Sequence, residues 1–139
     1  MAIFMKTLSF NTRGEGDMID VTKRVQDVLS ASHINDGIVT MFVPGSTASL
    51  TTIEYEPGLE KDFPRAMDKL APKGAHYDHD ARWGDGNGNS HVKASMIGPS
   101  LVVPFEKGRL MLGTWQQIVF VDFDNRPRER QMIVQVMGE

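Results

Sequence analysis

The amino-acid sequence predicts an α+β fold with a mostly antiparallel, β-sandwich-like core and two helices. Three observations support this prediction. Short apolar or β-branched segments recur between clusters of turn residues, two segments carry helical spacing, and 40% of the residues are hydrophobic against 24% charged. No internal repeat or linker divides the sequence, so we expect a single domain over residues 1–139.

The N-terminal part of the sequence predicts a strand followed by a helix. Residues 3–10 alternate loosely between apolar and polar and indicate an opening strand, and residues 11–16 are rich in turn formers. Asp20 suits the N-cap of a helix that we expect to end near His33. The apolar positions of this helix fall at i, i+4, i+7 and i+8, and they are Val21, Val25, Val28 and Leu29.

The middle of the sequence predicts two further strands and the second helix. Residues 38–43 read as a buried strand, and residues 49–55 are rich in β-branched side chains and should be extended. Helical spacing then returns at Leu59, Phe63, Ala66, Met67 and Leu70. Because proline is excluded from a helix interior, Pro64 leads us to expect a helix that begins at residue 62 or 63 and ends before Pro72.

The C-terminal part of the sequence predicts a long polar loop and then an antiparallel meander. The loop covers residues 77–91, and regular structure should resume over residues 91–97. The predicted strands are residues 100–103, a long strand within residues 110–123, and residues 129–137, with turns at residues 106–109 and 124–127. The last strand alternates apolar and polar side chains, which is typical of a sheet with one buried face.

Composition excludes several classes of protein. The chain has no cysteine, which rules out disulfides and thiolate metal sites, and its net charge of −3 does not favour a broad nucleic-acid interface. No apolar run approaches the roughly 20 residues of a membrane span. The segment Met1–Lys6 lacks the charged-then-apolar plan of a signal peptide, so we expect a cytoplasmic protein without membrane or nucleic-acid partners.

The polar segment 77–91 is the first candidate site. It holds two of the four histidines, His79 and His91, among aspartates, asparagines and glycines. Neutral imidazoles bind divalent cations, and the carboxylate of Asp80 can orient an imidazole or share the metal. The alternative is that both histidines are loop residues bonded to backbone or water. The residues alone leave both interpretations open.

The second candidate site follows the predicted strand 38–43. Ser46 and Thr47 come directly after a glycine, and such a turn can offer hydroxyls and backbone N–H groups to an anion. The alternative is a strand-ending turn with threonine pairs across the sheet. Glu54 stands within a β-branched stretch, so we expect its carboxylate to face the interior and to act as a general acid or base.

Two further segments carry chemistry that a ligand could use. Trp115 offers an aromatic face and Gln116 a donor and an acceptor, although a tryptophan at the start of a strand is equally consistent with a core position. Residues 126–130 place three arginines around a proline and a glutamate. We interpret that segment as a solvated turn of alternating charge, with phosphate binding as the alternative.

Taken together, these segments resemble the YjbQ family, whose members have been described as secondary thiamine-phosphate synthase enzymes. The resemblance covers nearly the whole chain. The matching stretches are Gly45-Ser46-Thr47-Ala48-Ser49-Leu50-Thr51-Thr52-Ile53-Glu54, His79-Asp80, Ser90-His91-Val92-Lys93-Ala94-Ser95, Gly113-Thr114-Trp115-Gln116 and Gly138-Glu139.

The resemblance implies a compact α+β fold, a homotrimer and a polar cleft near the subunit contacts. The implied catalytic residues are Glu54, His79, Asp80 and His91. The implied substrate-binding residues are Ser46, Thr47, Asn87, Trp115 and Gln116. His79 and His91 would hold a divalent metal, zinc by preference, and the substrate would be a small phosphorylated or heteroaromatic molecule.

One position departs from the family pattern. Many relatives have histidine where this chain has Gly45, so a third ligand would be missing here. The first hypothesis is a small-molecule enzyme, with transferase chemistry such as thiamine-phosphate synthesis. The second is a metal- or ligand-binding trimer without turnover, and the third is a polar loop that serves only to build the trimer interface.

Overall fold

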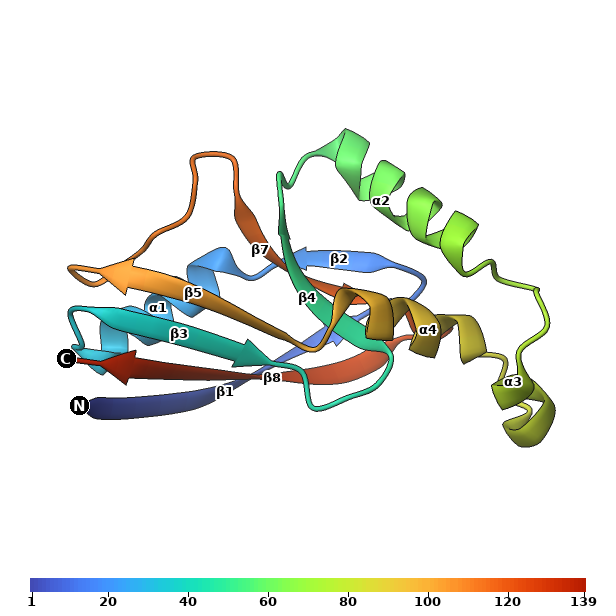
Figure 1. The fold of residues 1–139 in the computed structure, drawn as a ribbon, viewed down its shortest axis with the longest axis horizontal. Coiled ribbons are helices and arrows are strands. Elements are labelled where there is room, and N and C mark those ends of the chain that lie inside the picture. Colours follow the sequence, from blue (N-terminus) through green and yellow to red (C-terminus); the bar gives the residue numbers. More distant parts are fainter.

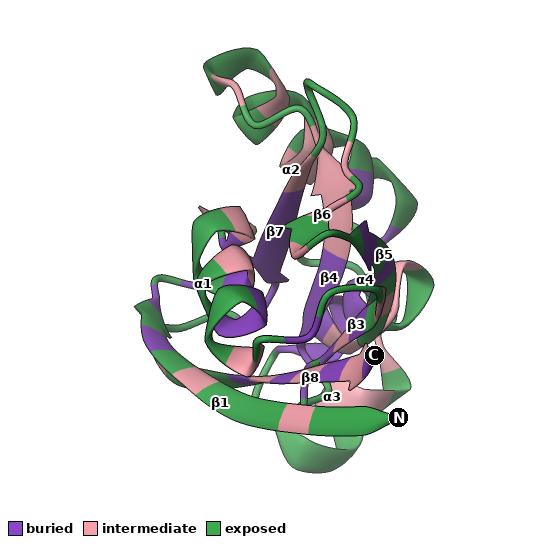
Figure 2. Cartoon of the chain, turned by 90° about the vertical axis from the view of Figure 1, so that its left-hand side faces the viewer, coloured by how far each residue is buried: buried purple, intermediate pink, exposed green.

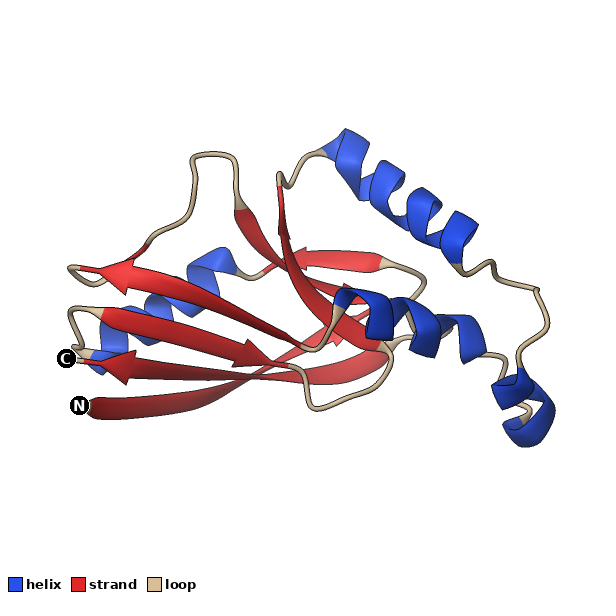
Figure 3. Ribbon diagram, in the orientation of Figure 1, coloured by secondary structure: helices blue, strands red, loops and turns tan.

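The computed structural model describes residues 1–139 and shows a layered α+β fold (Figure 1 and Figure 3). The strands are β1 (Ala2–Thr12), β2 (Asp17–Asp20), β3 (Gly37–Phe42), β4 (Ala48–Ile53), β5 (Ser100–Glu106), β6 (Arg109–Leu110), β7 (Gln117–Asp122) and β8 (Arg128–Gly138). The helices are α1 (Thr22–Ser32), α2 (Pro57–Leu70), α3 (Asp78–Trp83) and α4 (Gly88–Ile97). The predicted fold class is confirmed.

The strands form two antiparallel sheets. The larger sheet has the order β1-β8-β3-β5-β6, and the smaller has the order β2-β7-β4. The N-terminal strand β1 pairs along its whole length with the C-terminal strand β8, from Ala2 opposite Gly138 to Thr12 opposite Arg128. The two termini therefore lie side by side at one end of the molecule, and α3 lies at the opposite end (Figure 1).

The main core lies between the inner faces of the two sheets and is closed by α1. The predicted apolar face of α1 is confirmed, because Val25, Val28 and Leu29 are buried. They meet alternate residues of β8 and β3 and the inward side chains of β4 and β7. Figure 2 shows this burial along α1 and β7, whereas much of β1 stays exposed. The alternation that predicted the strands thus places one face of each strand in the core.

A second core covers the outer face of the smaller sheet. It contains Met18, Met67, Ala94, Val119, Val121 and Phe123. These residues come from β2, α2, α4, β7 and the position after β7, so the two helices form a third layer over the sheet (Figure 1). Because β7 is buried on both faces, its residues 118–121 are all apolar rather than alternating with polar ones.

Helix α2 begins earlier than we expected, and the prediction of a start at residue 62 or 63 is wrong. The carboxylate of Glu56 accepts hydrogen bonds from the N–H groups of Gly58 and Leu59, and Pro57 occupies the first turn, so the helix has a strong N-terminal cap. Pro64 lies inside the helix. Its cost, about 3 kcal/mol, is offset by burial of the helix face that carries Met67.

The segment 77–91 is not a loop, and the structure has four helices where we expected two. Helix α3 begins after Tyr77, and α4 begins at Gly88 rather than at residue 91. Neither segment was predicted to be helical, because neither has a broad apolar face. Helix α4 instead buries polar side chains, among them Asn89, Ser90 and Lys93.

The strands after α4 also differ in length from the prediction. Strand β5 continues through Pro104 to Glu106, whereas the long strand expected within residues 110–123 is only β7, preceded by irregular chain. Strand β5 pairs with β3 in the larger sheet, and the turn at residues 107–108 connects it to β6 as predicted. No helix combines the length and apolarity that crossing a membrane requires.

Candidate functional site

The two histidines of the polar segment meet where α3 and α4 approach each other. The rings of His79 on α3 and His91 on α4 have centroids 4.5 Å apart. Nδ1 of His79 lies 3.4 Å from Asp80 Oδ1 and 3.5 Å from Asp85 Oδ1. Both His79 and Asp80 are partly buried, and Asp85 is more exposed. We call His79, Asp80, Asp85 and His91 the His–Asp cluster.

The His–Asp cluster contains three potential ligands for a metal ion. One ligand atom from each of His79, Asp80 and Asp85 lies within 4.8 Å of the others. The two separations from His79 match the edge of about 3.4 Å expected for a tetrahedral zinc site with bonds of about 2.1 Å. His91 lies beside this group but outside it. Sequence reasoning missed Asp85, although it stands only six residues after His79.

Asp80 is held in place by the start of α4. Its Oδ1 accepts a hydrogen bond of 2.8 Å from the backbone N–H of Gly88. A β-carbon at Gly88 would stand 2.6 Å from the Tyr77 β-carbon and 3.0 Å from Asp80 Oδ1. Glycine is therefore required for α3 and α4 to approach closely enough to bring the two histidines together.

A small pocket of about 150 Å³ lies beside His91, between α4 and the turn that joins β3 to β4. Its lining residues are Gly45, Ser46, Ala48, His91, Ala94, Ser95 and Pro99. The predicted anion-binding residue Ser46 is exposed and lines this pocket. We call it the Gly45 pocket. It brings one predicted binding residue next to one predicted catalytic residue.

A buried network of charges lies behind the turn that carries Ser46. Asp122 and Asp124, at the end of β7, are fully buried. The Thr47 hydroxyl donates to Asp124 at 3.0 Å and accepts from Arg130 at 2.7 Å. Arg130 also makes two hydrogen bonds to Asp122, of 2.7 and 2.8 Å. The predicted binding residue Thr47 is therefore fully engaged within the protein.

The network fixes the charge state of its members. Burial alone would raise the pKa of Asp124, but hydrogen bonds from the Asn125 backbone and Thr47, together with the charge of Arg128, lower this pKa below its ordinary value. The hydrogen bond to Asp122 raises the pKa of Arg130 further above its usual range. Asp124 and Arg130 are thus charged at neutral pH.

Asn87 connects this network to the His–Asp cluster. Its side chain is buried, and in one orientation the amide nitrogen lies 3.5 Å from Asp124 Oδ1. In the opposite orientation the nitrogen donates to Asp85 Oδ1 at 3.1 Å. The predicted substrate-binding residue therefore stands between the buried network and the exposed carboxylate of the cluster.

The interpretation of residues 126–130 as a solvated turn is wrong for two of its arginines. The side chain of Arg130 is only 11% exposed and that of Arg128 34%, and both pair with fully buried carboxylates. They lie on β8 and pair with carboxylates at the end of β7. The local sequence around the arginines does not indicate this contact between two strands. Of the three arginines, only Arg126 is classed as exposed.

The remaining predicted residues lie elsewhere in the protein. Glu54 follows the last residue of β4 and is exposed, so our expectation that its carboxylate faces the interior is wrong. Trp115 is 72% exposed, not a core residue, and Gln116 donates to Thr52 near the same end of the strand. Strand β4 separates this group from the Gly45 pocket by about 17 Å.

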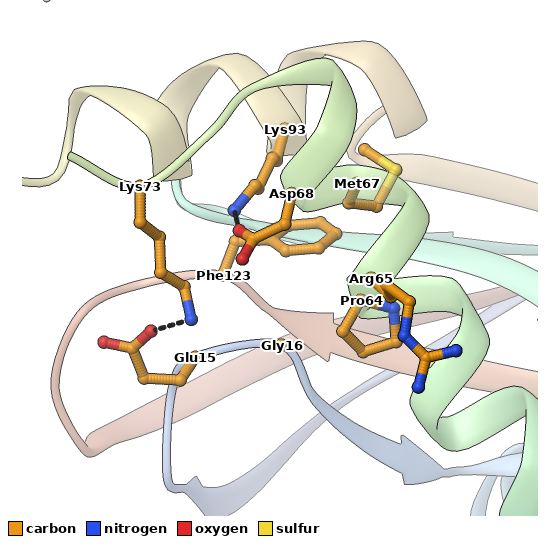
Figure 4. A pocket seen from close by; sticks show the side chains of 9 residues that line it. All are labelled: Glu15, Gly16, Pro64, Arg65, Met67, Asp68, Lys73, Lys93 and Phe123. Carbon is orange, nitrogen blue, oxygen red and sulfur yellow. Dashed lines mark hydrogen bonds and ion pairs between the residues drawn. The ribbon is translucent and has the colours of Figure 1, made fainter. Parts of the chain in front are cut away.

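A second, separate pocket of about 230 Å³ lies between α2, α4 and the turn after β1 (Figure 4). Four of its charged residues form two ion pairs. The buried Lys93 contacts Asp68 at 2.6 Å, and Lys73 contacts Glu15 at 2.6 Å. This arrangement connects α2 to the helix that carries His91.

Fold and site together define the class: a two-sheet α+β protein in which α3 and α4 bring His79, Asp80 and His91 together, with Asp85 in the connection between the helices. The sequence family described as UPF0047 protein YjbQ-like matches residues 6–139, and the chain belongs to this family. A UPF0047 protein of Archaeoglobus fulgidus is 40% identical over 130 residues, covering 94% of this chain and 98% of the relative.

Further relatives agree with this assignment. The UPF0047 protein YugU of Bacillus subtilis is 38% identical over 136 residues, covering 96% of this chain and 99% of that protein. The crystal structure of a YbjQ-like protein of unknown function from Sulfolobus solfataricus has a TM-score of 0.94 at 29% identity, with 99% of each chain covered. A Clostridium acetobutylicum member gives 0.88 at 34% identity, covering 95% of this chain and 99% of that chain.

Proposed function

We propose that this protein is a small-molecule enzyme whose His–Asp cluster holds a divalent metal ion, with zinc as the preferred ion. The observation that carries the proposal is the convergence of His79, Asp80 and Asp85 on one point beside His91. The substrate would be a small phosphorylated or heteroaromatic molecule, and the reaction a transfer such as thiamine-phosphate synthesis. The resemblance to described thiamine-phosphate synthases supports the choice of reaction.

Each residue of the cluster has a distinct part in this proposal. His79 and the two carboxylates would bind the metal, and the hydrogen bond from Gly88 holds Asp80 in the orientation required. His91 faces both the cluster and the Gly45 pocket, so its imidazole would exchange a proton with a substrate bound there. A bound divalent ion would supply positive charge to stabilise a leaving oxyanion.

Metal analysis of protein purified without an affinity tag tests the site. We expect about one divalent ion per subunit, because the three ligands would form a single tetrahedral face with one position left open. His79→Ala should abolish binding and Asp85→Asn should weaken it. His76→Ala is the matched control, since His76 lies in the same segment but is exposed and pairs only with Asp78.

Two results would contradict the metal part of the proposal. One is wild-type protein that takes up no added zinc, iron or manganese after removal of bound ions. The other is loss of metal in His76→Ala as large as in His79→Ala. For catalysis, the coupling of an aminopyrimidine diphosphate to a thiazole phosphate is the assay, and a folded His79→Ala variant should lose turnover.

We also propose that the protein assembles as a homotrimer. The outward face of the larger sheet exposes apolar side chains in neighbouring strands: Ile3, Met5, Ile38, Phe42 and Val102. Such a face favours contact with further copies of the chain. Light scattering should give three subunits for the wild type and fewer for Phe42→Glu. Leu70→Glu, which changes an exposed apolar residue on α2, should leave the assembly intact.

A trimer would also account for the separation of the predicted site residues. Glu54 follows the end of β4 that is opposite the Gly45 pocket, and Trp115 precedes Gln116, which bonds Thr52 near that same end, so a neighbouring copy would supply them to the site. Mixing His79→Ala with Glu54→Gln subunits should then restore part of the turnover. Failure to restore it in confirmed mixed trimers would remove Glu54 from the site.

The second candidate function is a metal- or ligand-binding trimer without turnover. The observation that favours it is the distance of Glu54 from the Gly45 pocket. No carboxylate lines that pocket, so no carboxylate base faces a ligand bound there. Metal binding without turnover on phosphorylated heteroaromatic substrates would support this alternative. If His79→Ala gives monomers instead, the polar segment serves assembly.

A further inference from the structure

We propose that Arg130 forms an oxyanion-binding site with Ser46, reached through the space left by Gly45. The inference deepens the proposed function, since the oxyanion would be the phosphate group of the substrate in the same pocket. It assigns the recognition of that group to a residue that the sequence led us to place in a solvated turn.

The hydrogen bonds of Arg130 leave one edge of its guanidinium group free. Nε donates to Asp122, and Nη2 donates to Asp122 and to Thr47. These bonds use three of the five N–H donors of the side chain. Nη1 makes no hydrogen bond within the protein, so its two N–H groups remain for a ligand or water.

The free edge faces Gly45. A β-carbon at Gly45 would stand 3.3 Å from Arg130 Nη1, closer than side chains ordinarily approach. Gly45 does not have a positive φ, so its backbone does not require glycine. Gly45 lines the Gly45 pocket and Arg130 does not, so a ligand in the pocket would reach Nη1 only past Gly45, where no side chain stands in the way. A larger residue would cover the guanidinium edge.

The chemistry of this opening suits a phosphate group. An N–H of Nη1, on a permanently charged group, can donate to one phosphate oxygen, and Ser46 adds a hydroxyl at the edge of the pocket. Asp122 neutralises much of the Arg130 charge, so free phosphate should bind only weakly. Binding should strengthen for an organic phosphate whose remaining atoms contact the pocket walls.

The experiment titrates metal-free protein with inorganic phosphate and with phenyl phosphate, using calorimetry for affinity and ¹⁵N NMR for position. We expect saturable binding of both, tighter for phenyl phosphate, with the largest shifts at the Gly45 and Ser46 amides and the Arg130 side chain. Gly45→Leu should weaken binding by about tenfold or more, because it covers both Nη1 donors. Gly45→Ala should give an intermediate loss.

Arg126→Leu is the matched control, since Arg126 is exposed in the adjacent turn and should change affinity by no more than about twofold. Equal losses in Arg126→Leu and Gly45→Leu would indicate attraction by surface charge and overturn the proposal. So would phosphate binding that Gly45→Ala and Gly45→Leu leave unchanged, or no saturable binding at all. A higher affinity for phenyl phosphate than for inorganic phosphate assigns the site to an organic substrate. Equal affinities for the two ligands assign it to free phosphate. Because the protein is metal-free, failure of the metal site would leave this test intact.

Discussion

The ion pair between Lys93 and Asp68 should respond very differently to the removal of each partner. The ammonium group of Lys93 is buried, with 4% of its side chain exposed, and contacts Asp68 Oδ1 at 2.6 Å and Asn89 Oδ1 at 3.1 Å (Figure 4). Asp68 is 43% exposed. Removing Asp68 leaves a buried cation without its counterion, whereas removing the charge of Lys93 leaves a carboxylate that water can reach.

The magnitudes follow from this asymmetry. Asp68→Ala should lower the free energy of unfolding by about 3 kcal/mol, the lower end of the cost of breaking a buried pair. Lys93→Met keeps the length and the apolar contacts of the side chain and should cost less than about 1 kcal/mol. The double variant should resemble Lys93→Met, because the orphaned cation is gone. Urea unfolding at one fixed protein concentration measures all three.

Asp62→Ala is the control for this series. Asp62 pairs with Arg65 on the same helix, but both side chains are more than half exposed, so the change should cost well under about 1 kcal/mol. The reasoning is refuted if Asp68→Ala costs no more than Asp62→Ala, or if Lys93→Met destabilises the protein more than Asp68→Ala does.

Three further predictions concern the buried network and the sheets. Because the pKa of Asp124 is lowered on folding, its contribution to stability is complete above about pH 4 and is lost as pH falls through the folded pKa. The urea midpoint of the wild type should therefore fall more steeply in acid than that of Asp124→Asn. Thr47→Val removes two hydrogen bonds and should cost about 2 kcal/mol, whereas Ser49→Ala removes a buried hydroxyl without a partner and should be neutral or stabilising, as urea unfolding can show. Gly138→Ala would place a β-carbon 2.0 Å from the Asp36 carbonyl oxygen and should markedly lower the thermal midpoint.

Local sequence patterns predicted the parts of the fold that depend on local periodicity. The apolar spacing in residues 21–29 located α1, and alternation in residues 129–137 located β8. Helix α2 was misplaced because the rule against interior proline was applied to Pro64 without the competing contribution of the Glu56 cap. Tertiary packing against the smaller sheet decided the outcome, and that packing is not visible in a local window.

The candidate site was likewise predictable from local sequence only in part. His79 and Asp80 are adjacent in sequence, and their contact could be anticipated from the polar segment that contains them. The network around Asp122 could not, because its partners come from β1, from the turn before β4 and from β8. A carboxylate at the end of a continuously buried strand was the available signal, since a buried charge needs a partner.

The buried network is expensive for a protein of this size, and its cost favours a role in binding. Placing charged groups in the interior costs several kcal/mol per ion, and apolar replacements of similar volume often match or exceed the stability of a buried ion pair. Stability alone therefore does not require Arg130 and Asp122 at these positions. What the network does provide is a guanidinium plane held by three hydrogen bonds, with Nη1 directed at Gly45. A fixed donor at the edge of a pocket reduces the cost of ordering a ligand. If Arg130 serves binding in this way, replacing the network with well-packed apolar residues should preserve or raise the unfolding midpoint while abolishing phosphate binding.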